Sequence, residues 1–590
     1  MKNMSNLATS MRTHTCNQLT KKEKDKKVKL CGWVHSFRDH GGLIFIDLRD
    51  KYGLTQICFD PKFEKKAYGS GASLRREDCI QVEGVVKERM KGMANPKLDT
   101  GDIEVFVSKL EIISKAEVPP IEVDDRIEAN EEIRLKYRYL DLRRPIMQKR
   151  LQKRAETTKA FRDYLTLNGF LEVETPLLIK TTPEGARDYI VPSRVNPGEF
   201  YALPQSPQLY KQILMIAGCD RYFQVAKCLR DEDLRADRQP EHTQVDLEMS
   251  FVSEEDIRSF IEGMFKHIVK QVYSKDLKYN FPRISFKESM EKYGNDKPDL
   301  RFGLELKNVT ALVKDSDFQV FKDVIKNGGI VKCINPEAEF SRNELDELIS
   351  ICVKNGAKGM AWMKFENGKL NSNIIKFFKD DLLKKLIKET GIKKGYLFFI
   401  ADKEKTVNSV LSALRNELGK RLNLITDELK FCWIVDFPLF EFNDDENRWD
   451  FAHNPFVMPK KEHLQFIPKN PEKVEGYLYD LVLNGVELGS GAIRASKPEI
   501  QEKLFSVVGI SEKEARDKFG FLLDAYKYGG PNHGGMGLGL DRFIALMHGT
   551  NDIREFIAFP KNKKAECPMD GSPSKPDDKQ LKELHIKIIS

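Results

Sequence analysis

Three glycines that alternate along one short segment constrain the fold most strongly. Gly535, Gly537 and Gly539 are separated by single apolar residues, so in an extended strand all three fall on one face. A strand face without side chains allows another backbone or a ligand to approach closely. Arg542 opens the predicted helix that follows, where its charge can face a phosphate beside the helix N-terminus. The segment therefore predicts a strand that faces a ligand, with close helix packing as the alternative.

A polar hairpin is the second constraining feature. A strand predicted from residue 223 ends in a dense polar loop at residues 230–241, and a second strand returns over residues 243–251. Gln244, Asp246 and Glu248 are alternate residues, so their side chains share one face of that strand. A polar and partly acidic face on an apolar hairpin predicts a site lined by the sheet. An amphipathic sheet with its polar face towards solvent is the alternative.

The composition excludes several classes of protein. The 590 residues are 32% charged and 41% hydrophobic, which excludes long disorder and a disulfide-dense scaffold. No segment approaches the ~20 consecutive apolar residues of a membrane span. The first ten residues lack a secretory signal, and Met11 offers a second start. The ten cysteines contain no zinc-type pair. We therefore expect a cytoplasmic protein with reduced thiols and no membrane association.

The order of predicted elements divides the chain into a barrel, a split α+β domain and an insertion. Five short strands between residues 28 and 107, with one helical stretch, predict a small Greek-key barrel of the oligonucleotide-binding type (OB-fold). An apolar stripe from Met147 to Leu165 predicts a helix. The predicted boundaries are 1–115 for the barrel, 116–145 for a hinge, 146–298 and 425–565 for the split domain, 299–424 for a Lys-rich α/β insertion and 566–590 for a tail.

Together, the hairpin and the glycine strand resemble motifs 2 and 3 of class II aminoacyl-tRNA synthetases, and residues 169–176 resemble motif 1. The three motifs occur in family order. The resemblance to bacterial-type aspartyl-tRNA synthetases extends over residues 11–565. It implies an antiparallel-sheet catalytic domain, an anticodon-binding barrel and a homodimer that forms around Pro176. The other segments that carry this resemblance are residues 186–189, 203–211 and 519–525.

The resemblance implies the chemistry of aminoacyl-adenylate formation, in which a carboxylate attacks the α-phosphate of ATP. Because the nucleophile is already ionised, the protein needs only to align the reactants and stabilise charge. Arg230 is implied to contact the α-phosphate and the amino-acid carboxylate, and Arg542 the γ-phosphate. Asp480 and Glu487 are implied ligands of Mg²⁺, with surface acids on a sheet as the alternative. The implied catalytic residues are Arg230, Arg542 and Glu487; the implied ATP-binding residues are Arg230, Asp231, Glu232, Gln239, Glu487, Gly539, Leu540, Asp541 and Arg542.

The resemblance also implies a pocket for L-aspartate. Asp246 and Gln208 match the side that binds the α-ammonium group, and Lys211 and Arg494 match the pair that binds the side-chain carboxylate. The family often has a histidine at the position of Asn454, which leaves the pH response of this pocket open. The remaining implied aspartate-binding residues are Glu184, on a loop that closes over the ligand, Ser206, Arg230 and His453.

In the barrel, Phe45 and Gln56 match the anticodon-reading positions, with Arg38 and Glu104 beside them. A phenylalanine on a barrel surface offers a platform on which a base can stack, whereas a buried core position for Phe45 is the alternative. Gln56 offers a donor and acceptors to one unpaired base.

Two loop positions of the barrel bear on which tRNA is accepted. His40 and Gly92 resemble the pair found in family members that aspartylate both tRNA-Asp and tRNA-Asn. A neutral histidine donates or accepts, so it tolerates either pyrimidine at the third anticodon position, and glycine has no side chain that selects. Two tight turns without a role in selection are the alternative.

The sequence therefore predicts an aspartate–tRNA ligase that uses ATP and Mg²⁺ and charges tRNA-Asp and tRNA-Asn. Charging of tRNA-Asn implies a partner amidotransferase that converts Asp-tRNA-Asn to Asn-tRNA-Asn. Three alternatives stay open: an enzyme that accepts tRNA-Asp only, a sister enzyme for asparagine or lysine, and a non-catalytic RNA-binding paralogue. The Lys211–Arg494 pair argues against the second alternative, because neither asparagine nor lysine has a side-chain carboxylate for this pair to bind. The residues that argue against the third are Arg230, Glu232, Asp480, Glu487 and Arg542.

Overall fold

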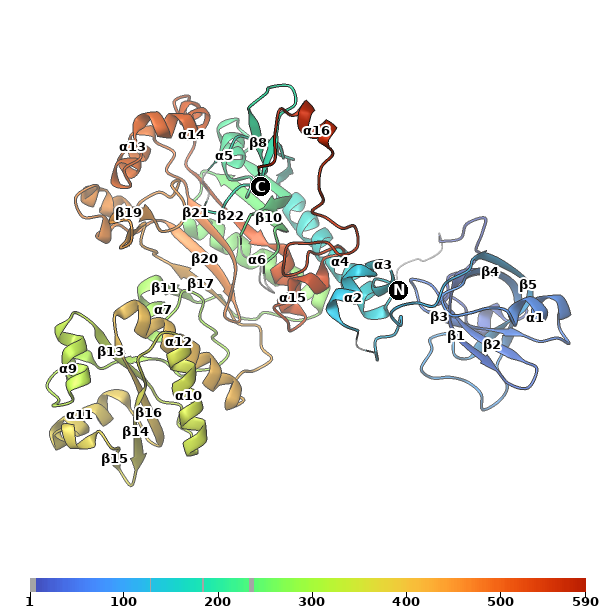
Figure 1. Ribbon diagram of the computed structural model, residues 1–590, viewed down its shortest axis with the longest axis horizontal. Coiled ribbons are helices and arrows are strands. Elements are labelled where there is room, and N and C mark those ends of the chain that lie inside the picture. The colour runs from blue at the N-terminus through green and yellow to red at the C-terminus, as the bar shows by residue number, and fades with distance from the viewer. Residues whose placement is uncertain (1–6, 128, 183–184, 233–237, 590) are drawn as a thin grey trace. The chain divides into compact units, whose positions relative to one another are not determined.

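The computed structural model describes residues 7–127, 129–182, 185–232 and 238–589 (Figure 1). The chain divides into two compact units, which are residues 1–154 with 554–575 and residues 155–553 with 576–590. Across the described residues, no helix is both long enough and apolar enough to cross a membrane.

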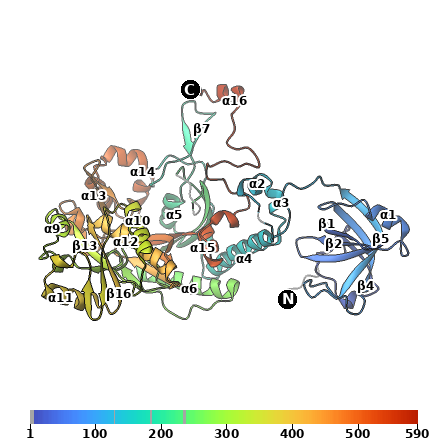
Figure 2. The same cartoon turned by 60° about the horizontal axis from the view of Figure 1, so that its bottom comes forward.

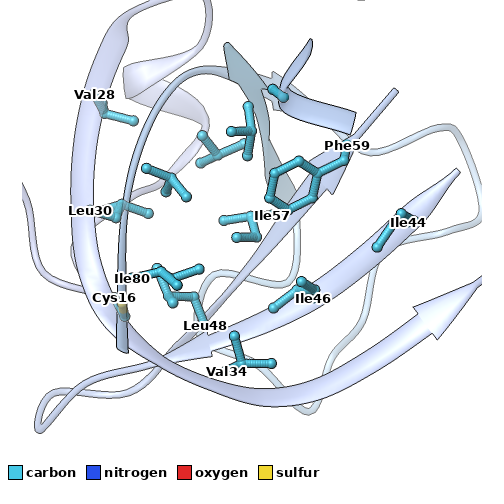
Figure 3. Packing of buried hydrophobic residues seen from close by; sticks show 14 of the residues in the cluster. Cys16, Val28, Leu30, Val34, Ile44, Ile46, Leu48, Ile57, Phe59 and Ile80 are labelled. Carbon is cyan, nitrogen blue, oxygen red and sulfur yellow. The ribbon is translucent and has the colours of Figure 1, made fainter. Parts of the chain in front are cut away.

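The first unit contains the predicted five-stranded barrel. The sheet closes in the order β1-β2-β3-β5-β4, as the OB-fold prediction requires. Along β2, Ile44, Ile46 and Leu48 are buried in the barrel core, and Phe45 and Asp47 alternate with them on the outer side (Figure 3). The elements are β1 (Lys27–Asp39), β2 (Ile44–Arg49), β3 (Leu54–Phe59), α1 (Lys65–Gly71), β4 (Cys79–Glu88) and β5 (Ile103–Ser114).

Arginines and carboxylates hold the segment that follows the barrel. Where the sequence predicts a hinge, two short helices form, α2 (Glu131–Lys136) and α3 (Arg138–Asp141). The fully buried Asp141 carboxylate accepts hydrogen bonds from Arg134 at 2.9 Å and from Arg144 at 3.1 Å. Burial raises the pKa of Asp141, but Arg134 outweighs this effect and lowers it. The basic run of this segment is therefore ordered by ion pairs.

The second unit is built on an eight-stranded sheet with the order β11-β17-β20-β21-β22-β10-β9-β6. All pairs are antiparallel except the two at the edges, which confirms the predicted antiparallel catalytic sheet. Its strands are β6 (Leu171–Glu172), β9 (Arg221–Leu229), β10 (Glu241–Ser250), β11 (Arg283–Ser285), β17 (Phe431–Val435), β20 (Leu478–Leu483), β21 (Val486–Ile493) and β22 (His533–Gly539).

Helices and two small hairpins complete this part of the second unit. Phe161, Phe265 and Phe543 pack edge to face with one another and so join three helices, α4, α6 and α15. The helices are α4 (Pro145–Leu167), α5 (Gln208–Ile216), α6 (Glu254–Tyr273), α7 (Phe286–Tyr293), α13 (Pro498–Val507), α14 (Glu512–Tyr526), α15 (Leu540–Met547) and α16 (Asp578–Glu583); the hairpins are β7 (Ile190–Pro192) with β8 (Phe200–Ala202) and β18 (Phe440–Asn443) with β19 (Arg448–Phe451).

The Lys-rich insertion forms a three-layer α/β structure (Figure 2). Its five-stranded antiparallel sheet has the order β12-β13-β16-β14-β15. One hydrophobic core packs α10 and α12 on one sheet face, and a second core packs α8, α9 and α11 on the other. The elements are β12 (Lys307–Asn308), α8 (Thr310–Val313), α9 (Gln319–Lys326), β13 (Ile330–Ile334), α10 (Arg342–Lys354), β14 (Ala361–Glu366), β15 (Lys369–Asn371), α11 (Asp380–Thr390), β16 (Gly395–Asp402) and α12 (Glu404–Arg421).

Candidate active site

The glycine strand β22 lies beside the polar strand β10, and their register explains both patterns. Gln244 pairs with Gly539, Asp246 with Gly537 and Glu248 with Gly535, so each polar residue stands opposite a glycine. A Cβ added at Gly535 would lie 2.1 Å from Glu248 Oε2 and 2.0 Å from Leu247 O. The bare face predicted from sequence therefore makes room for the polar face of the neighbouring strand.

The close approach at Gly535 predicts a large effect of one methyl group. We expect Gly535→Ala to lower the free energy of unfolding by about 1–3 kcal/mol, because carbonyl and carboxylate atoms already occupy the space. Gly520→Ala is the matched control, since Gly520 lies within α14 and an added Cβ there meets no atom within 4 Å. Urea unfolding of both variants is the measurement. Equal midpoints for the two variants would contradict the role of Gly535.

A cavity of about 310 Å³ opens over this part of the sheet. It brings together most of the residues implied for ATP and aspartate: Ser206, Gln208, Lys211, Arg230, Glu232, Gln239, Asp246, Glu487, Gly539, Asp541 and Arg542. Five other implied residues do not line it: Asp231, Leu540, His453, Asp480 and Arg494. Glu184 lies outside the described residues.

Two cations and two carboxylates form a buried cluster at one side of the cavity. Lys211 Nζ lies 3.2 Å from Asp246 Oδ1 and 3.4 Å from Glu248 Oε2. Arg494 donates to both oxygens of Glu248, from Nε at 2.8 Å and from Nη2 at 3.1 Å. Burial raises the pKa of Asp246. Burial alone would also raise the pKa of Glu248, but Arg494 and Lys211 outweigh it and lower that pKa. Glu248 thus connects Arg494 to Lys211.

Four buried polar atoms at the implied ligand positions have no hydrogen-bond partner. They are Gln208 Nε2, Arg230 Nε, Asp246 Oδ2 and Asp480 Oδ1. Buried polar atoms are almost always hydrogen-bonded, so each exception requires an explanation. Two donors and two acceptors without partners are what a site for a ligand with both anionic and cationic groups would present.

The start of α15 is tied to two strands beside the cavity. Arg542 Nη1 donates to Glu487 O at 2.6 Å, which ties the helix to β21. Asp541 Oδ2 accepts from Thr243 N at 2.7 Å, so this carboxylate anchors β10 to α15. Glu232 pairs with Arg238 at 3.2 Å across the mouth of the cavity.

Asp480 and Glu487 have the chemistry of a site for a hard cation. A bulge in the pairing of β20 with β21 brings Glu487 to the face that Asp480 shares with Ser490. Burial raises the pKa of Asp480 well above its usual range, and the nearby Glu487 charge adds to this rise. A bound cation would relieve both effects. Among the described residues, no group of three or more His, Cys, Asp or Glu side chains surrounds a metal position.

Two residues of the site were not assigned from the sequence. Glu248 alternates with Asp246, and that spacing was the signal that it belongs to the same face. His242 lines the cavity, and burial with the charges of Arg230 and Arg542 lowers its pKa to about 4, so its ring is neutral near pH 7. His453, implied for the aspartate pocket, is exposed, and its ring packs against Phe437 at 4.9 Å.

On the outer face of the barrel, three of the four implied anticodon residues form one hydrogen-bonded chain. Arg38 Nη2 donates to Gln56 Oε1 at 3.3 Å, and Gln56 Nε2 donates to Glu104 Oε2 at 2.8 Å. Arg38 also pairs with Asp47 at 2.8 Å, a residue that the sequence analysis did not assign. The chain fixes the orientation of the Gln56 amide and leaves it one N–H and one lone pair for a base.

The two loop positions differ in their surroundings. The His40 ring lies 6.0 Å from the Phe45 ring, which is half-buried on the outer side of β2. Phe45 is therefore not a core residue. Gly92 has a φ of 86°, and an added Cβ would meet no atom within 4 Å.

A family model for class II tRNA synthetases of the D, K and N group matches residues 130–563, and a model for OB-fold nucleic acid binding domains matches residues 28–113. The chain belongs to this class II synthetase family. The synthetase is 50% identical over 581 residues to the aspartate–tRNA(Asp/Asn) ligase of Caldanaerobacter subterraneus subsp. tengcongensis, with 98% of each chain covered. It is also 50% identical to the ligase of that name from Treponema denticola, with 98% and 99% covered.

The fold of the synthetase is shared with solved structures. The asparaginyl-tRNA synthetase of Pyrococcus horikoshii, complexed with asparaginyl-adenylate, matches with a TM-score of 0.58 and 20% identity, and 93% and 97% of the two chains are covered. An aspartyl-tRNA synthetase of Entamoeba histolytica matches with a TM-score of 0.56 and 18% identity, with 93% and 91% covered.

Proposed function

We propose that the protein is an aspartate–tRNA ligase that acts on both tRNA-Asp and tRNA-Asn. The observation that carries this proposal is the set of unpartnered buried atoms around one cavity. Asp246 Oδ2 is an acceptor suited to an α-ammonium group, and Gln208 Nε2 and Arg230 Nε are donors suited to carboxylate or phosphate oxygens. The two relatives at 50% identity, both named aspartate–tRNA(Asp/Asn) ligase, support the same activity.

The charge of the cluster favours aspartate. Lys211 and Arg494 balance the charges of Asp246 and Glu248 within the cluster, and Arg230, which lines the same cavity, adds one positive charge. Aspartate at neutral pH carries one net negative charge, so the complex is balanced. Asparagine is neutral and would leave a charge in a buried site without compensation.

In the proposed reaction, a carboxylate oxygen of aspartate attacks the α-phosphorus of ATP and the bond to pyrophosphate breaks. Arg230 orients the carboxylate and the α-phosphate, and Arg542 at the start of α15 holds the far end of the triphosphate. Asp480 and Glu487 would hold Mg²⁺, which supplies positive charge to the phosphates. The 3′-terminal ribose hydroxyl of the tRNA then attacks the aspartyl carbonyl, and AMP leaves.

The anticodon chain on the barrel would read the bases that the two tRNAs share. Phe45 offers a stacking face, and Gln56 offers its remaining N–H and lone pair. His40 and Gly92 contribute no group that selects one third base over the other. A partner amidotransferase would then complete the synthesis of Asn-tRNA-Asn.

A homodimer is proposed from exposed apolar side chains that follow the first motif. Leu171, Leu177 and Leu178 on either side of Pro176 are each more than half exposed. Such side chains on one short segment are suited to burial against a second copy of the chain.

The acceptance of both tRNAs is tested at His40. We expect purified tRNA-Asp and tRNA-Asn transcripts to be charged with similar kcat/KM. We expect His40→Leu to shift the preference towards tRNA-Asp by about 1–3 kcal/mol, because an apolar side chain cannot adapt its hydrogen bonding to both bases. A wild-type preference for tRNA-Asp beyond ~100-fold, which is about 2.7 kcal/mol, would show a selective contact elsewhere and contradict the proposal.

A further inference from the structure

The inserted domain carries most of the net charge of the chain. Residues 299–424 contain 23 Lys and Arg against 17 Asp and Glu, a net charge of +6, and the whole chain carries +7. Within this domain the excess is concentrated at residues 376–394, which hold seven lysines and three acidic residues. This stretch is α11 with its two flanks. The proposed reaction uses none of it.

Five of these lysines form a surface, which we call the α11 lysine face: Lys384, Lys385, Lys388, Lys393 and Lys394. Lys384 and Lys388 lie one helical turn apart on one side of α11, while Leu386 is buried in the domain core on the other. Gly391, with a φ of 67°, ends the helix just before the last two lysines. All five side chains are exposed.

Among the described residues, the five lysines have no partner, a property that they share with the exposed Lys354, Lys358, Lys403 and Lys420, whereas a few lysines of the same domain are paired. Lys322 pairs with Asp317 at 2.9 Å, and Lys364 pairs with Glu339 at 3.1 Å. Within the part of the chain that the structure describes, no carboxylate lies within 4.0 Å of any lysine on the α11 lysine face, and none of them takes part in a hydrogen bond through its side chain. Five uncompensated positive charges thus lie exposed within residues 384–394, on α11 and on the segment that leads into β16.

The inserted domain is fixed to the strands and helices that precede it. The guanidinium of the fully buried Arg415 in α12 lies over the ring of Tyr293 in α7, 4.9 Å from its centroid. Lys332 on β13 donates to Met290 O in α7 at 3.1 Å. These buried contacts hold the domain against the catalytic part, and both views place α11 at its outer margin (Figures 1 and 2).

We propose that the α11 lysine face binds the sugar-phosphate backbone of the tRNA during charging. The inference rests on the proposed function, since it takes the polyanion to be the tRNA substrate. Lysine ammonium groups act as point charges towards phosphates, and phosphate contacts position a nucleic acid without reading its sequence. The face therefore serves tRNA-Asp and tRNA-Asn alike, in contrast to the anticodon-reading barrel.

The test removes four of the charges in the full-length protein through Lys384→Gln, Lys388→Gln, Lys393→Gln and Lys394→Gln. Binding of both transcripts is measured by fluorescence anisotropy at several KCl concentrations. We expect affinity for both tRNAs to fall by about tenfold or more, and the slope of log K against log[salt] to decrease by up to about 3, since each lost phosphate contact contributes about 0.7–0.9. Aspartate-dependent ATP–pyrophosphate exchange without tRNA is expected to stay at the wild-type rate.

The matched control removes four exposed lysines from the opposite layer of the same domain, through Lys354→Gln, Lys358→Gln, Lys403→Gln and Lys420→Gln. We expect the control to keep most of the wild-type affinity and slope. An equal loss of tRNA affinity in both variants would show that the effect comes from the overall charge of the domain, and it would overturn the proposal. Unchanged tRNA binding in the α11 variant would also overturn the proposal. The same holds if the wild-type protein binds phosphatidylserine vesicles and the α11 variant loses that binding while it keeps its affinity for tRNA. If the wild-type protein showed no aspartate-dependent pyrophosphate exchange, the proposed function itself would be refuted. That result is distinct from the tRNA-binding results, which test only the α11 lysine face.

Discussion

Arg230→Ala and Arg542→Ala are each expected to reduce aspartate-dependent ATP–pyrophosphate exchange by about 10²-fold or more, while the fold stays intact. Both arginines line the cavity, and in the proposed reaction they bind different ends of the triphosphate. Arg230 Nε is buried without a hydrogen-bond partner, so it is available to donate to a ligand. Arg542 is held by Glu487 O. Each substitution removes positive charge at the place where the reacting phosphates develop negative charge.

The control for these variants is Arg238→Ala, since Arg238 also lines the cavity but is exposed and pairs with Glu232. We expect this variant to lose far less activity than the other two. Circular dichroism and urea unfolding establish that all three variants fold. Exchange at the wild-type rate in Arg230→Ala or Arg542→Ala would contradict the assignment of that arginine.

The second large effect is selection of aspartate over asparagine before any tRNA binds. We expect kcat/KM for exchange to favour aspartate by about 10³-fold or more, because a neutral amide leaves one buried charge without a partner. Lys211 and Arg494 carry only donors, so they cannot accept a hydrogen bond from the amide NH₂ group. Lys211 is buried, with two carboxylates within 3.4 Å.

Lys211→Met tests the origin of this selection, because methionine keeps much of the length of lysine and removes its charge. We expect this variant to lose activity with aspartate and most of the preference over asparagine. Gln205→Met is the matched control, since Gln205 is also buried but hydrogen-bonds to Ala186 and Asp188 and does not line the cavity. Similar kcat/KM for the two amino acids in the wild-type protein would refute the pocket.

The barrel and the central strands were predictable because their signals are local. Alternation of buried and exposed residues along β2 and the glycines of β22 identify strands in the sequence itself. The register that sets Glu248 opposite Gly535 joins strands almost 300 residues apart, so no local pattern contains it. The hydrogen bonds between Arg494 and Glu248 depend on that register. For this reason the resemblance implied Arg494, but the sequence left Glu248 without an assigned role.

The remaining differences have a similar cause. The resemblance implied Asp541 as an ATP-binding residue; it lines the cavity, and its carboxylate also accepts a hydrogen bond from Thr243 N of β10, which no local pattern indicates. The segment predicted as a hinge contains helices because Asp141 gathers arginines that are several residues apart. In both cases a carboxylate binds groups of the protein itself, and the sequence alone does not show which groups.

The measurement that tests the central claim most directly is transfer from an isolated intermediate. The protein is incubated with ATP and radiolabelled aspartate, freed of small molecules by gel filtration, and mixed with tRNA-Asp or tRNA-Asn in separate reactions. The account predicts that label elutes with the protein as aspartyl-adenylate and then moves to the 3′ end of both tRNAs. Absence of bound label, or transfer to tRNA-Asp alone, would contradict it.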